Sequence, residues 1–319
     1  MNTVYRDVAG PCLAPQGSVV CIGAFDGVHR GHQAVLERVR ARASDLRSTP
    51  VAVSFAPIPR AYFAEVPQLT SPREKIKALI DAGMQRVLLL RFNAQLADMT
   101  AEDFIARVLV DRLATREVWV GDGFKFGHGR KGDLTMLQEL GVEEWFTADV
   151  VPPFVVDGER VSSSRIRALL AAGEFDAVEP LLGRRFSIGG HVVHGQQLGR
   201  KLGYPTANIP LRSRSAPVGG VFAVRVRGAA PAARPGVASL GVRPTIAEAT
   251  GETLLEAHLF DFDGDLYGKR LEVEFVKKLR NEEKFPDIGA MVQQIDRDAQ
   301  AARKILGLAA ARARTGVTV

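Results

Sequence analysis

The chain has 319 residues, of which 46% are hydrophobic and 24% are charged, and its formal net charge is +6. This composition is typical of a soluble globular protein with enough apolar residues for two cores. The length predicts two domains, with one large domain as the alternative. The positive balance suits anionic ligands such as nucleotides. The basic residues are scattered rather than gathered into a stripe with aromatic residues, so we expect no nucleic-acid partner.

The sequence carries none of the usual marks of export or membrane insertion. Cys12 and Cys21 form neither a metal-binding pattern nor a disulfide framework. The first residues lack the basic and apolar regions of a signal peptide. Because no run of about 18 apolar residues occurs, we expect no membrane span and a cytoplasmic location.

Four short apolar runs in the first half predict the buried strands of a parallel sheet. They are residues 18–22, 51–55, 86–90 and 117–121. Between the first two runs, apolar residues recur on one helical face at Leu36, Val39, Ala43 and Leu46. The alternation of strands and helices predicts a doubly wound α/β domain.

Two further helices have recognisable starts in the first half. Ser71, Pro72 and Glu74 predict a capping box, with Gly83 ending the helix that follows. Thr100 with Asp103 predicts a similar start.

The pattern changes near residue 185 to short strands with period-two alternation, separated by loops that contain Gly and Pro. This pattern predicts a small antiparallel β-barrel, closed by a helix near 287–306. We therefore predict one domain over 1–184 and a second over 185–319.

The stretch "GAFDGVHRGHQ" (23–33) follows the first apolar run and precedes a helix. A strand, a glycine-rich turn and a helix N-terminus form a phosphate-binding arrangement. His29 and His32 stand where the turn becomes the helix, and Gly31 permits close backbone approach. Imidazoles there can stabilise charge on a transferring phosphate, although two exposed histidines at a helix start would give the same pattern.

Two other segments offer polar groups for phosphates. In "VSSSRIR" (161–167), serine hydroxyls and arginines could hold a triphosphate, but a capped helix has the same residues. In "HGQQLGRKLGYPTANIP" (194–210), Thr206 and Asn208 would share one face of an extended segment and could bind Mg²⁺, but a Pro-Thr turn is the alternative. "GHGRKG" (127–132) matches G-x-G-x-x-G, and we interpret it as a loop.

Together these motifs carry a resemblance to a known family. "GAFDGVHRGHQ" and "VSSSRIR" resemble the two signatures of HxGH nucleotidyltransferases, and "GRKLGYPTAN" resembles the riboflavin kinase signature. Further stretches, including 70–93, 120–133 and 255–269, are similar to the bifunctional bacterial riboflavin kinase/FMN adenylyltransferase family. The resemblance covers about residues 18–306, and its motifs occur in the family's order.

The resemblance implies an enzyme that phosphorylates riboflavin to FMN and then transfers an adenylyl group from ATP to FMN. It implies His29 and His32 as catalytic groups for adenylyl transfer and Glu256 as the base for the ribityl hydroxyl of riboflavin. The expected ligands are ATP, Mg²⁺ at Thr206 and Asn208, and the flavins; apo-flavoproteins that receive FAD are expected partners. The remaining expected binding residues are Gly23, Phe25, Asp26, Gly31, Ser163, Ser164, Arg165, Arg167, Gly195, Gly199 and Arg200.

Three positions depart from the family's usual residues. Gly123 stands where Asp or Asn is usual, Ile58 where many members have His, and Ser239 where Asn is usual. Gly123 prompts one alternative, a chain in which only the kinase is active. A second alternative is a regulator that binds flavin or nucleotide without catalysis. The proposed catalytic groups argue against the regulator, because a protein that only binds needs no catalytic base.

Overall fold

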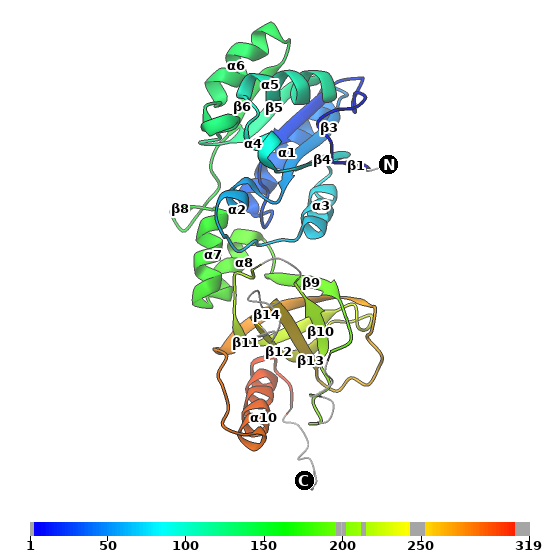
Figure 1. The fold of residues 1–319 in the computed structure, drawn as a ribbon, viewed down its shortest axis with the longest axis vertical. Helices are drawn as coiled ribbons and strands as arrows, with labels where there is room; N and C mark the ends of the chain where they lie inside the picture. The colour runs from blue at the N-terminus through cyan, green and yellow to red at the C-terminus, as the bar shows by residue number, and fades with distance from the viewer. Residues whose placement is uncertain (1–2, 196–198, 200–201, 212–214, 243–252, 310–319) are drawn as a thin grey trace. The chain divides into compact units, whose positions relative to one another are not determined.

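The computed structural model describes residues 3–195, 199, 202–211, 215–242 and 253–309 (Figure 1). The chain divides into two compact units, Met1–Arg165 with Leu181–Gly183 and Ile166–Pro180 with Arg184–Val319. This division assigns residues 166–180 to the second unit, whereas the sequence pattern suggests a boundary at 184/185; that domain boundary stays a prediction.

The first unit is built on a six-stranded parallel sheet, as the apolar runs predict. Its strand order is β1-β4-β3-β2-β5-β6, and every adjacent pair is parallel. The strands are β1 (Thr3–Tyr5), β2 (Ser18–Ile22), β3 (Thr49–Ala56), β4 (Arg86–Arg91), β5 (Thr115–Gly121) and β6 (Thr147–Val151). A two-stranded ribbon, β7 (Val155–Val156) with β8 (Glu159–Arg160), follows.

Helices cover both faces of this sheet, so its strands are apolar on both sides. One core joins α1 and α3 to the sheet, and a second core joins α5, η1 and α6 to the opposite face. The helices are α1 (Arg30–Asp45), α2 (Pro59–Phe63), α3 (Pro72–Asp81), α4 (Ala94–Ala97), α5 (Ala101–Phe104), the π-helical η1 (Ile105–Arg112), the 3₁₀ turn η2 (His128–Arg130) and α6 (Leu134–Glu143). The loop expected at 127–132 contains only η2 and a bridge between Phe126 and Gly132.

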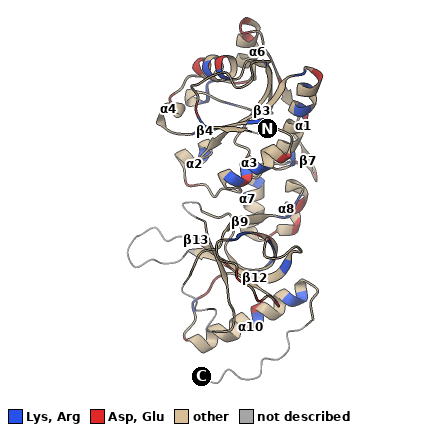
Figure 2. Ribbon diagram, turned by 90° about the vertical axis from the view of Figure 1, so that its right-hand side faces the viewer, with Lys and Arg blue, Asp and Glu red and all other residues tan. Residues whose placement is uncertain are grey.

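The expected helix starts are present. Ser71 and Glu74 form a reciprocal capping box on α3, and the Thr100 hydroxyl accepts from the Asp103 amide at 3.0 Å. Figure 2 shows both signs of charge along α3, in agreement with its solvated outer face.

The strand order reverses beside β2. From β2 the chain continues to β3 and β4 on one side, whereas β5 and β6 lie on the other. In an open α/β sheet, ligands bind at the carboxyl ends of the strands where this reversal occurs. The turn from Gly23 to His29 therefore leaves β2 at the position where a nucleotide site is expected.

The second unit holds a six-stranded antiparallel sheet in the order β10-β13-β12-β11-β14-β9. A bridge between Val193 and Asn208 brings the segment after β9 against β10 and nearly closes a barrel. The strands are β9 (Ser187–His191), β10 (Ala207–Pro210), β11 (Gly220–Arg227), β12 (Arg234–Val242), β13 (Thr253–Leu259) and β14 (Arg270–Arg280). The barrel and the final helix, α10 (Ile288–Ile305), confirm the predicted fold.

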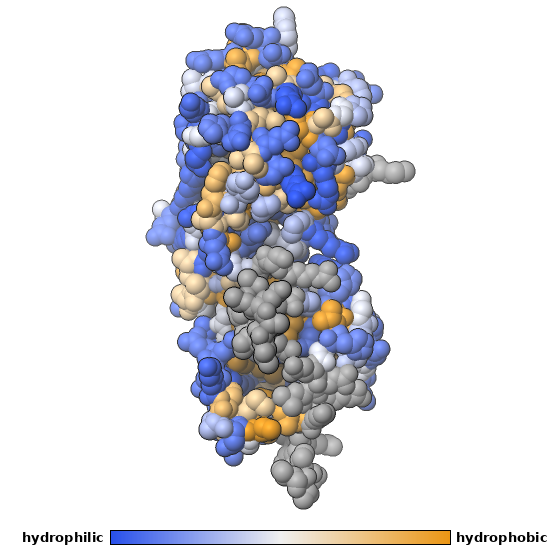
Figure 3. Space-filling view, viewed as in Figure 1, coloured by the Kyte–Doolittle hydropathy of each residue, from blue (hydrophilic) through white to orange (hydrophobic). Residues whose placement is uncertain are grey.

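Two helices connect the first sheet to the barrel along the chain. Helices α7 (Ser163–Ala172) and α8 (Phe175–Leu182) precede the barrel, and Phe175 stacks on Phe275 with ring centroids 5.9 Å apart. The face in Figure 3 is largely hydrophilic, with small apolar patches on both units. Within the described residues, no helix is long and apolar enough to cross a membrane.

Candidate active sites

The first candidate site is the turn between β2 and α1. The chain leaves the buried strand β2 at Gly23, and Phe25, Gly27 and Val28 take positive φ angles of 46°, 84° and 41°. His29 is the N-cap of α1, and its Nδ1 accepts from the His32 amide at 3.3 Å. This bond places the proton of a neutral His29 ring on Nε2, so the ring is oriented as a donor.

The two histidines form a stack that sequence spacing alone cannot establish. Their ring centroids are 3.6 Å apart with 17° between the planes. His29 is 6% exposed. Burial, with the neighbouring His29 and Lys75, lowers the pKa of His32 well below its usual value. His32 is therefore a neutral hydrogen-bonding group near pH 7.

Small and aromatic residues hold this stack in place. A Cβ at position 31 would come within 3.3 Å of the His29 ring, so Gly31 lets α1 start directly beside the imidazole. Phe25 is 1% exposed and contacts the His32 ring edge-on at 5.1 Å. A Cβ at Gly23 would meet the Phe25 ring at 3.2 Å. These three residues are placed to shape the turn.

Asp26 is 1% exposed and lies behind the turn. Its carboxylate accepts from the amides of Leu69 and Thr70 at 3.0 and 3.1 Å, and the Thr70 hydroxyl accepts from the Gly27 amide at 3.1 Å. Asp26 therefore ties the turn to the segment before α3. Direct contact of Asp26 with nucleotide stays a prediction.

Lys75 is a buried cation that the sequence analysis did not select. It lies on α3, is 2% exposed, and its Nζ donates to the Phe55 carbonyl at 2.9 Å. Burial lowers its pKa to about 8, although Asp26 opposes the shift. Lysines are ordinarily exposed, so the sequence alone gives no sign that Lys75 is buried with the apolar face of α3.

The start of α7 reaches the same turn through Ser163. Its hydroxyl donates to the Asp26 carbonyl at 2.9 Å, and the Ser164 hydroxyl accepts from Arg60 at 3.0 Å. Arg165 instead pairs with Glu159 at 2.9 Å and donates to carbonyls of the β7–β8 ribbon. Arg167 belongs to the second unit, and its expected phosphate contact stays a prediction.

Two of the departures from the family pattern lie in this unit. Gly123 follows β5, has φ +67°, and no heavy atom lies within 4 Å of the position a Cβ would take. The preceding Asp122 pairs with Arg160 at 3.1 Å. Ile58 is 3% exposed, so its side chain acts as a core residue.

An aromatic cluster follows the carboxyl ends of β3 and β4. Tyr62 is 42% exposed and Phe63 is 71% exposed. Phe92 contacts Phe55, Tyr62 and Phe63 with centroid distances of 5.9, 5.3 and 5.9 Å. Exposed aromatic faces at a ligand-binding edge of a sheet suit a planar aromatic ligand.

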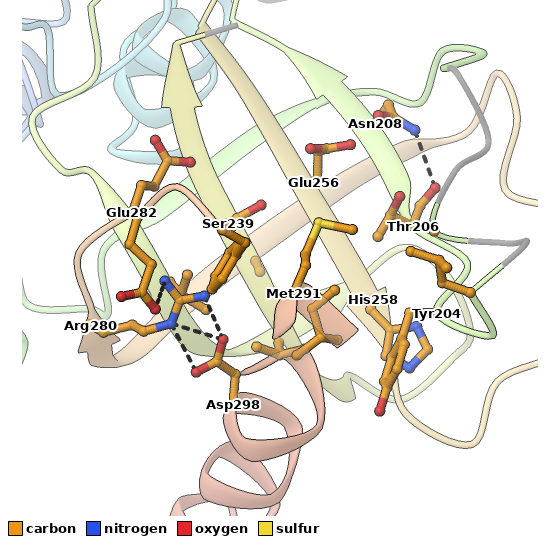
Figure 4. A pocket seen from close by; sticks show the side chains of 18 residues that line it. Tyr204, Thr206, Asn208, Ser239, Glu256, His258, Arg280, Glu282, Met291 and Asp298 are labelled. Carbon is orange, nitrogen blue, oxygen red and sulfur yellow. Dashed lines mark hydrogen bonds and ion pairs between the residues drawn. The ribbon is translucent and has the colours of Figure 1, made fainter. Parts of the chain in front are cut away.

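The second candidate site is organised by strand register. Glu256 on β13 pairs directly with Asn208 on β10 and with Ser239 on β12. Because directly paired residues point to the same face of a sheet, the three side chains form one row. Figure 4 shows Glu256 between Asn208 and Ser239.

This row lines a cavity of about 300 Å³ in the second unit. Tyr204, Thr206, His258 and Met291 also line it, as do residues after β14 and on α10 (Figure 4). A second cavity, of about 580 Å³, shares only Thr206 and Asn208 with the first. It is lined by Asp263, Asp265 and Tyr267 among others.

Asn208 has the properties of a ligand group. It is 6% exposed, and its buried Oδ1 has no hydrogen-bond partner among the residues that the structure describes. A Cβ at Gly195 would lie 2.6 Å from Asn208 Nδ2, and a Cβ at Gly199 would overlap the Tyr204 carbonyl. Both glycines therefore allow the preceding loop to pack on this segment. Arg200 lies outside the described residues.

Arg280 organises the wall of the cavity opposite Asn208. It binds Asp298 of α10 through Nε and Nη2 at 3.0 and 2.8 Å, and it lies 3.3 Å from Glu283. Its guanidinium stacks over Phe285 at 5.6 Å. These contacts hold the segment after β14 beside the cavity, and sequence analysis did not identify them.

The acidic and histidine residues described by the structure form no group of three that could bind a metal ion. A divalent ion in the second unit would depend on neutral oxygens such as Asn208 Oδ1 and on a ligand's phosphates. Mg²⁺ takes oxygen ligands, and at phosphoryl-transfer sites several of them come from water and from the phosphates of the substrate. The donor set therefore fits Mg²⁺ carried by a nucleotide.

Comparison with known proteins gives the same two-part organisation. Residues 13–165 match the family model for FAD synthetase, and residues 182–306 match that for riboflavin kinase. The bifunctional riboflavin kinase/FMN adenylyltransferase of Pseudomonas fluorescens is 45% identical over 299 residues, 93% of this chain and 96% of that protein. Its Escherichia coli K12 counterpart is 44% identical over 310 residues, 96% of this chain and 98% of that protein.

Among solved structures, a Streptococcus pneumoniae protein described as a macrolide-efflux protein has a TM-score of 0.77 at 28% identity. The match covers 95% of this chain and 98% of that chain. The fold is therefore shared over nearly the whole length, and the sequence relatives supply the functional family. The chain belongs to the bifunctional riboflavin kinase/FMN adenylyltransferase family.

Proposed function

We propose that the two candidate sites carry the two reactions of FAD biosynthesis. The chain is a riboflavin kinase and FMN adenylyltransferase, and its substrates are riboflavin, FMN and ATP. The second unit phosphorylates riboflavin, and the first transfers an adenylyl group to the FMN so formed. The observation that carries this assignment is the presence in one chain of the His29–His32 stack and of the Asn208–Glu256 row.

Adenylyl transfer is assigned to the turn before α1. A phosphate oxygen of FMN attacks the α-phosphorus of ATP, a new O–P bond forms, and pyrophosphate leaves. His29 donates through Nε2, and the neutral His32 ring donates without the penalty of burying a charge. Donors oriented in advance stabilise the charge that develops on the α-phosphate. Ser163 and Ser164 support the site from the start of α7.

The aromatic cluster is assigned to the flavin. Tyr62, Phe63 and Phe92 offer ring faces at the carboxyl edge of the same sheet. Stacking of the isoalloxazine ring there would orient the FMN phosphate toward the switch point beside β2. The exposure of the Tyr62 and Phe63 rings supports this role.

Riboflavin phosphorylation is assigned to the cavity around Glu256. Glu256 removes the proton from the terminal ribityl hydroxyl, that oxygen bonds to the γ-phosphorus, and the bond to ADP breaks. Thr206 and Asn208 would hold Mg²⁺, which when bound neutralises charge on the phosphates. We place riboflavin in the cavity lined by Glu256 and ATP in the cavity lined by Tyr267, since the two share Thr206 and Asn208.

The test is a product assay on the full chain with riboflavin, ATP and Mg²⁺, followed by separation of the flavins by chromatography. FAD is the expected product. FMN alone would support the alternative that only the kinase is active, and no product would support a regulator that binds without catalysis. A parallel reaction with FMN in place of riboflavin separates the two activities.

The proposal also includes a location and a partner. The protein acts in the cytoplasm, and apo-flavoproteins receive the FAD that it makes. FAD made there is available to folding flavoproteins. Fractionation of cells with a specific antibody tests the location. Transfer of newly made FAD to an apo-flavoprotein, compared with free FAD at equal concentration, tests the partnership.

A further inference from the structure

Arg60 is a cation in the first unit that neither the sequence motifs nor the proposed mechanism uses. It lies on the short helix α2, which follows β3, and it is exposed to solvent. Its Nη1 donates to the Ser164 hydroxyl at 3.0 Å, although the two residues are 104 positions apart in the chain. This contact brings a guanidinium from α2 to the start of α7.

Ser164 follows the residue that joins the start of α7 to the turn before α1. The Ser163 hydroxyl donates to the Asp26 carbonyl at 2.9 Å, and both serines belong to the first unit. The contacts therefore lead from the turn that carries His29 to Ser163, Ser164 and then Arg60. A triphosphate whose α-phosphorus lies at His29 can extend along this series of groups.

Arg60 differs in its partners from the arginines beside Ser164 in the sequence. Arg160 pairs with Asp122 at 3.1 Å. Arg165, within the serine-rich motif itself, pairs with Glu159 at 2.9 Å. Arg60 has no carboxylate partner within the part of the chain that the structure describes, and the hydroxyl that it contacts is neutral. Because a guanidinium carries five N–H donors, Arg60 can bind an anion without first breaking an ion pair.

The geometry of α2 separates Arg60 from the aromatic cluster. Residues two apart on a helix point about 200° apart, so Arg60 and Tyr62 lie on roughly opposite sides of α2. Tyr62 contacts the Phe92 ring at 5.3 Å, whereas Arg60 contacts Ser164. Arg60 is the one charged residue of α2. It therefore offers its charge away from the Tyr62–Phe92 contact, where the flavin is placed.

We propose that Arg60 binds the β- and γ-phosphates of ATP in the adenylyl-transfer site, together with the Ser164 hydroxyl. A guanidinium forms charge-assisted, often paired hydrogen bonds to phosphate. These two phosphates leave as pyrophosphate, so the same contact holds part of the substrate and the leaving group. The other anion at this site is the phosphate of FMN, and the experiment distinguishes the two. The inference deepens the proposed function of the first unit and rests on it.

The test is the inhibition of FAD formation by pyrophosphate in the full-length protein, measured against ATP at constant free Mg²⁺. Arg60→Gln is expected to raise the inhibition constant of pyrophosphate and the KM for ATP about tenfold, as for the loss of one hydrogen bond to a charged group. The KM for FMN should be unchanged. The KM for ATP in riboflavin phosphorylation should also be unchanged, because that reaction is assigned to the second unit.

Two further variants separate the geometry of Arg60 from its charge. Lysine keeps the charge but lacks the planar pair of donors, so Arg60→Lys should give an intermediate increase. It also keeps the test informative where Arg60→Gln affects folding, which circular dichroism detects. Arg107 is exposed on η1, on the opposite face of the sheet from α1. Arg107→Gln removes the same charge there and is the matched control, which should leave all these constants unchanged.

An unchanged inhibition constant of pyrophosphate in Arg60→Gln would overturn the inference. An equal rise in Arg107→Gln would also overturn it, because the effect would then be one of net charge. A rise confined to the KM for FMN would place Arg60 on the phosphate of FMN instead.

The proposed function fails separately, through a wild-type protein that forms no FAD from FMN and ATP. Calorimetric titration with pyrophosphate and Mg²⁺ then decides the role of Arg60 without catalysis. Binding that is weaker in Arg60→Gln than in the wild type and Arg107→Gln would retain the phosphate contact. Equal binding in all three proteins would reject it.

Discussion

The two sites of this protein are built in different ways. In the first unit the proposed reacting groups lie within one continuous turn, and His29 and His32 meet because they are three residues apart at the start of a helix. In the second unit Asn208, Ser239 and Glu256 meet only through the register of three strands. The site in the first unit depends on the conformation of one turn. The site in the second unit depends on the pairing of strands throughout the barrel.

The largest expected effect tests the independence of the two sites. His29→Ala combined with His32→Ala should reduce FAD formation from FMN by about 10⁴-fold, since each lost donor typically costs 10²–10³. FMN formation from riboflavin should persist at the wild-type rate. Both rates are measured by chromatography of the flavins, and normal FAD synthesis in the variant would refute the assignment of the turn.

The reciprocal change tests the site built by strand register. Glu256→Gln should reduce FMN formation by about 10³-fold, because the amide keeps the shape and loses the base. FAD formation from added FMN should continue, and ATP binding measured by calorimetry should change little. A parallel loss of both activities would instead indicate that the two sites depend on each other.

A stability experiment tests which residues complete the second core. Phe175 is 6% exposed and contacts Phe222 at 5.7 Å and Phe275 at 5.9 Å. A fragment of residues 185–319 lacks it and should be about 3–5 kcal/mol less stable than one of residues 166–319. Urea unfolding followed by circular dichroism measures this difference. Phe175→Ala in the longer fragment is the control and should reproduce most of the loss.

Lys75 provides a pH test confined to the first unit. Its folded pKa of about 8 lies below the ordinary 10.5, so the unfolded chain binds more protons between these values. Stability should therefore rise with pH from about 8 to 10.5, by about 3 kcal/mol in total. Lys75→Met should lack this rise. Urea unfolding followed by the fluorescence of Trp119 and Trp145 reports on this unit alone, and an equal rise in the variant would contradict the prediction.

The smallest expected effect concerns Gly123. Asp at this position restores the family's usual residue, and the space around its Cβ is open. The φ of +67° favours glycine, but Asp and Asn adopt it at modest cost. Gly123→Asp should leave FAD formation unchanged or raise it up to about threefold, whereas Gly123→Val should lower it. The measurement is the steady-state rate of FAD formation from FMN and ATP. Loss of this activity in a folded Gly123→Asp variant would show that the loop needs glycine.

The sequence by itself determined the two fold classes and the local turn in which the first site is proposed. The apolar runs of β2 to β5, the capping box of α3 and the change to period-two alternation all depend on neighbouring residues, and the structure agrees with them. The turn carrying His29 and His32 is also a local feature. Such signals are readable because periodicity and capping act over a few residues.

Only the tertiary structure decided which residues far apart in the sequence contact one another. The burial of Lys75, the tie between Asp26 and the segment before α3, and the bond between Arg280 and Asp298 join residues far apart in sequence. No local pattern marks them, because a lysine or glutamate has the same helix or loop preference whether it is buried or solvated. Their roles arise from strand register and from the low dielectric of a packed interior, which exist only once the chain has folded.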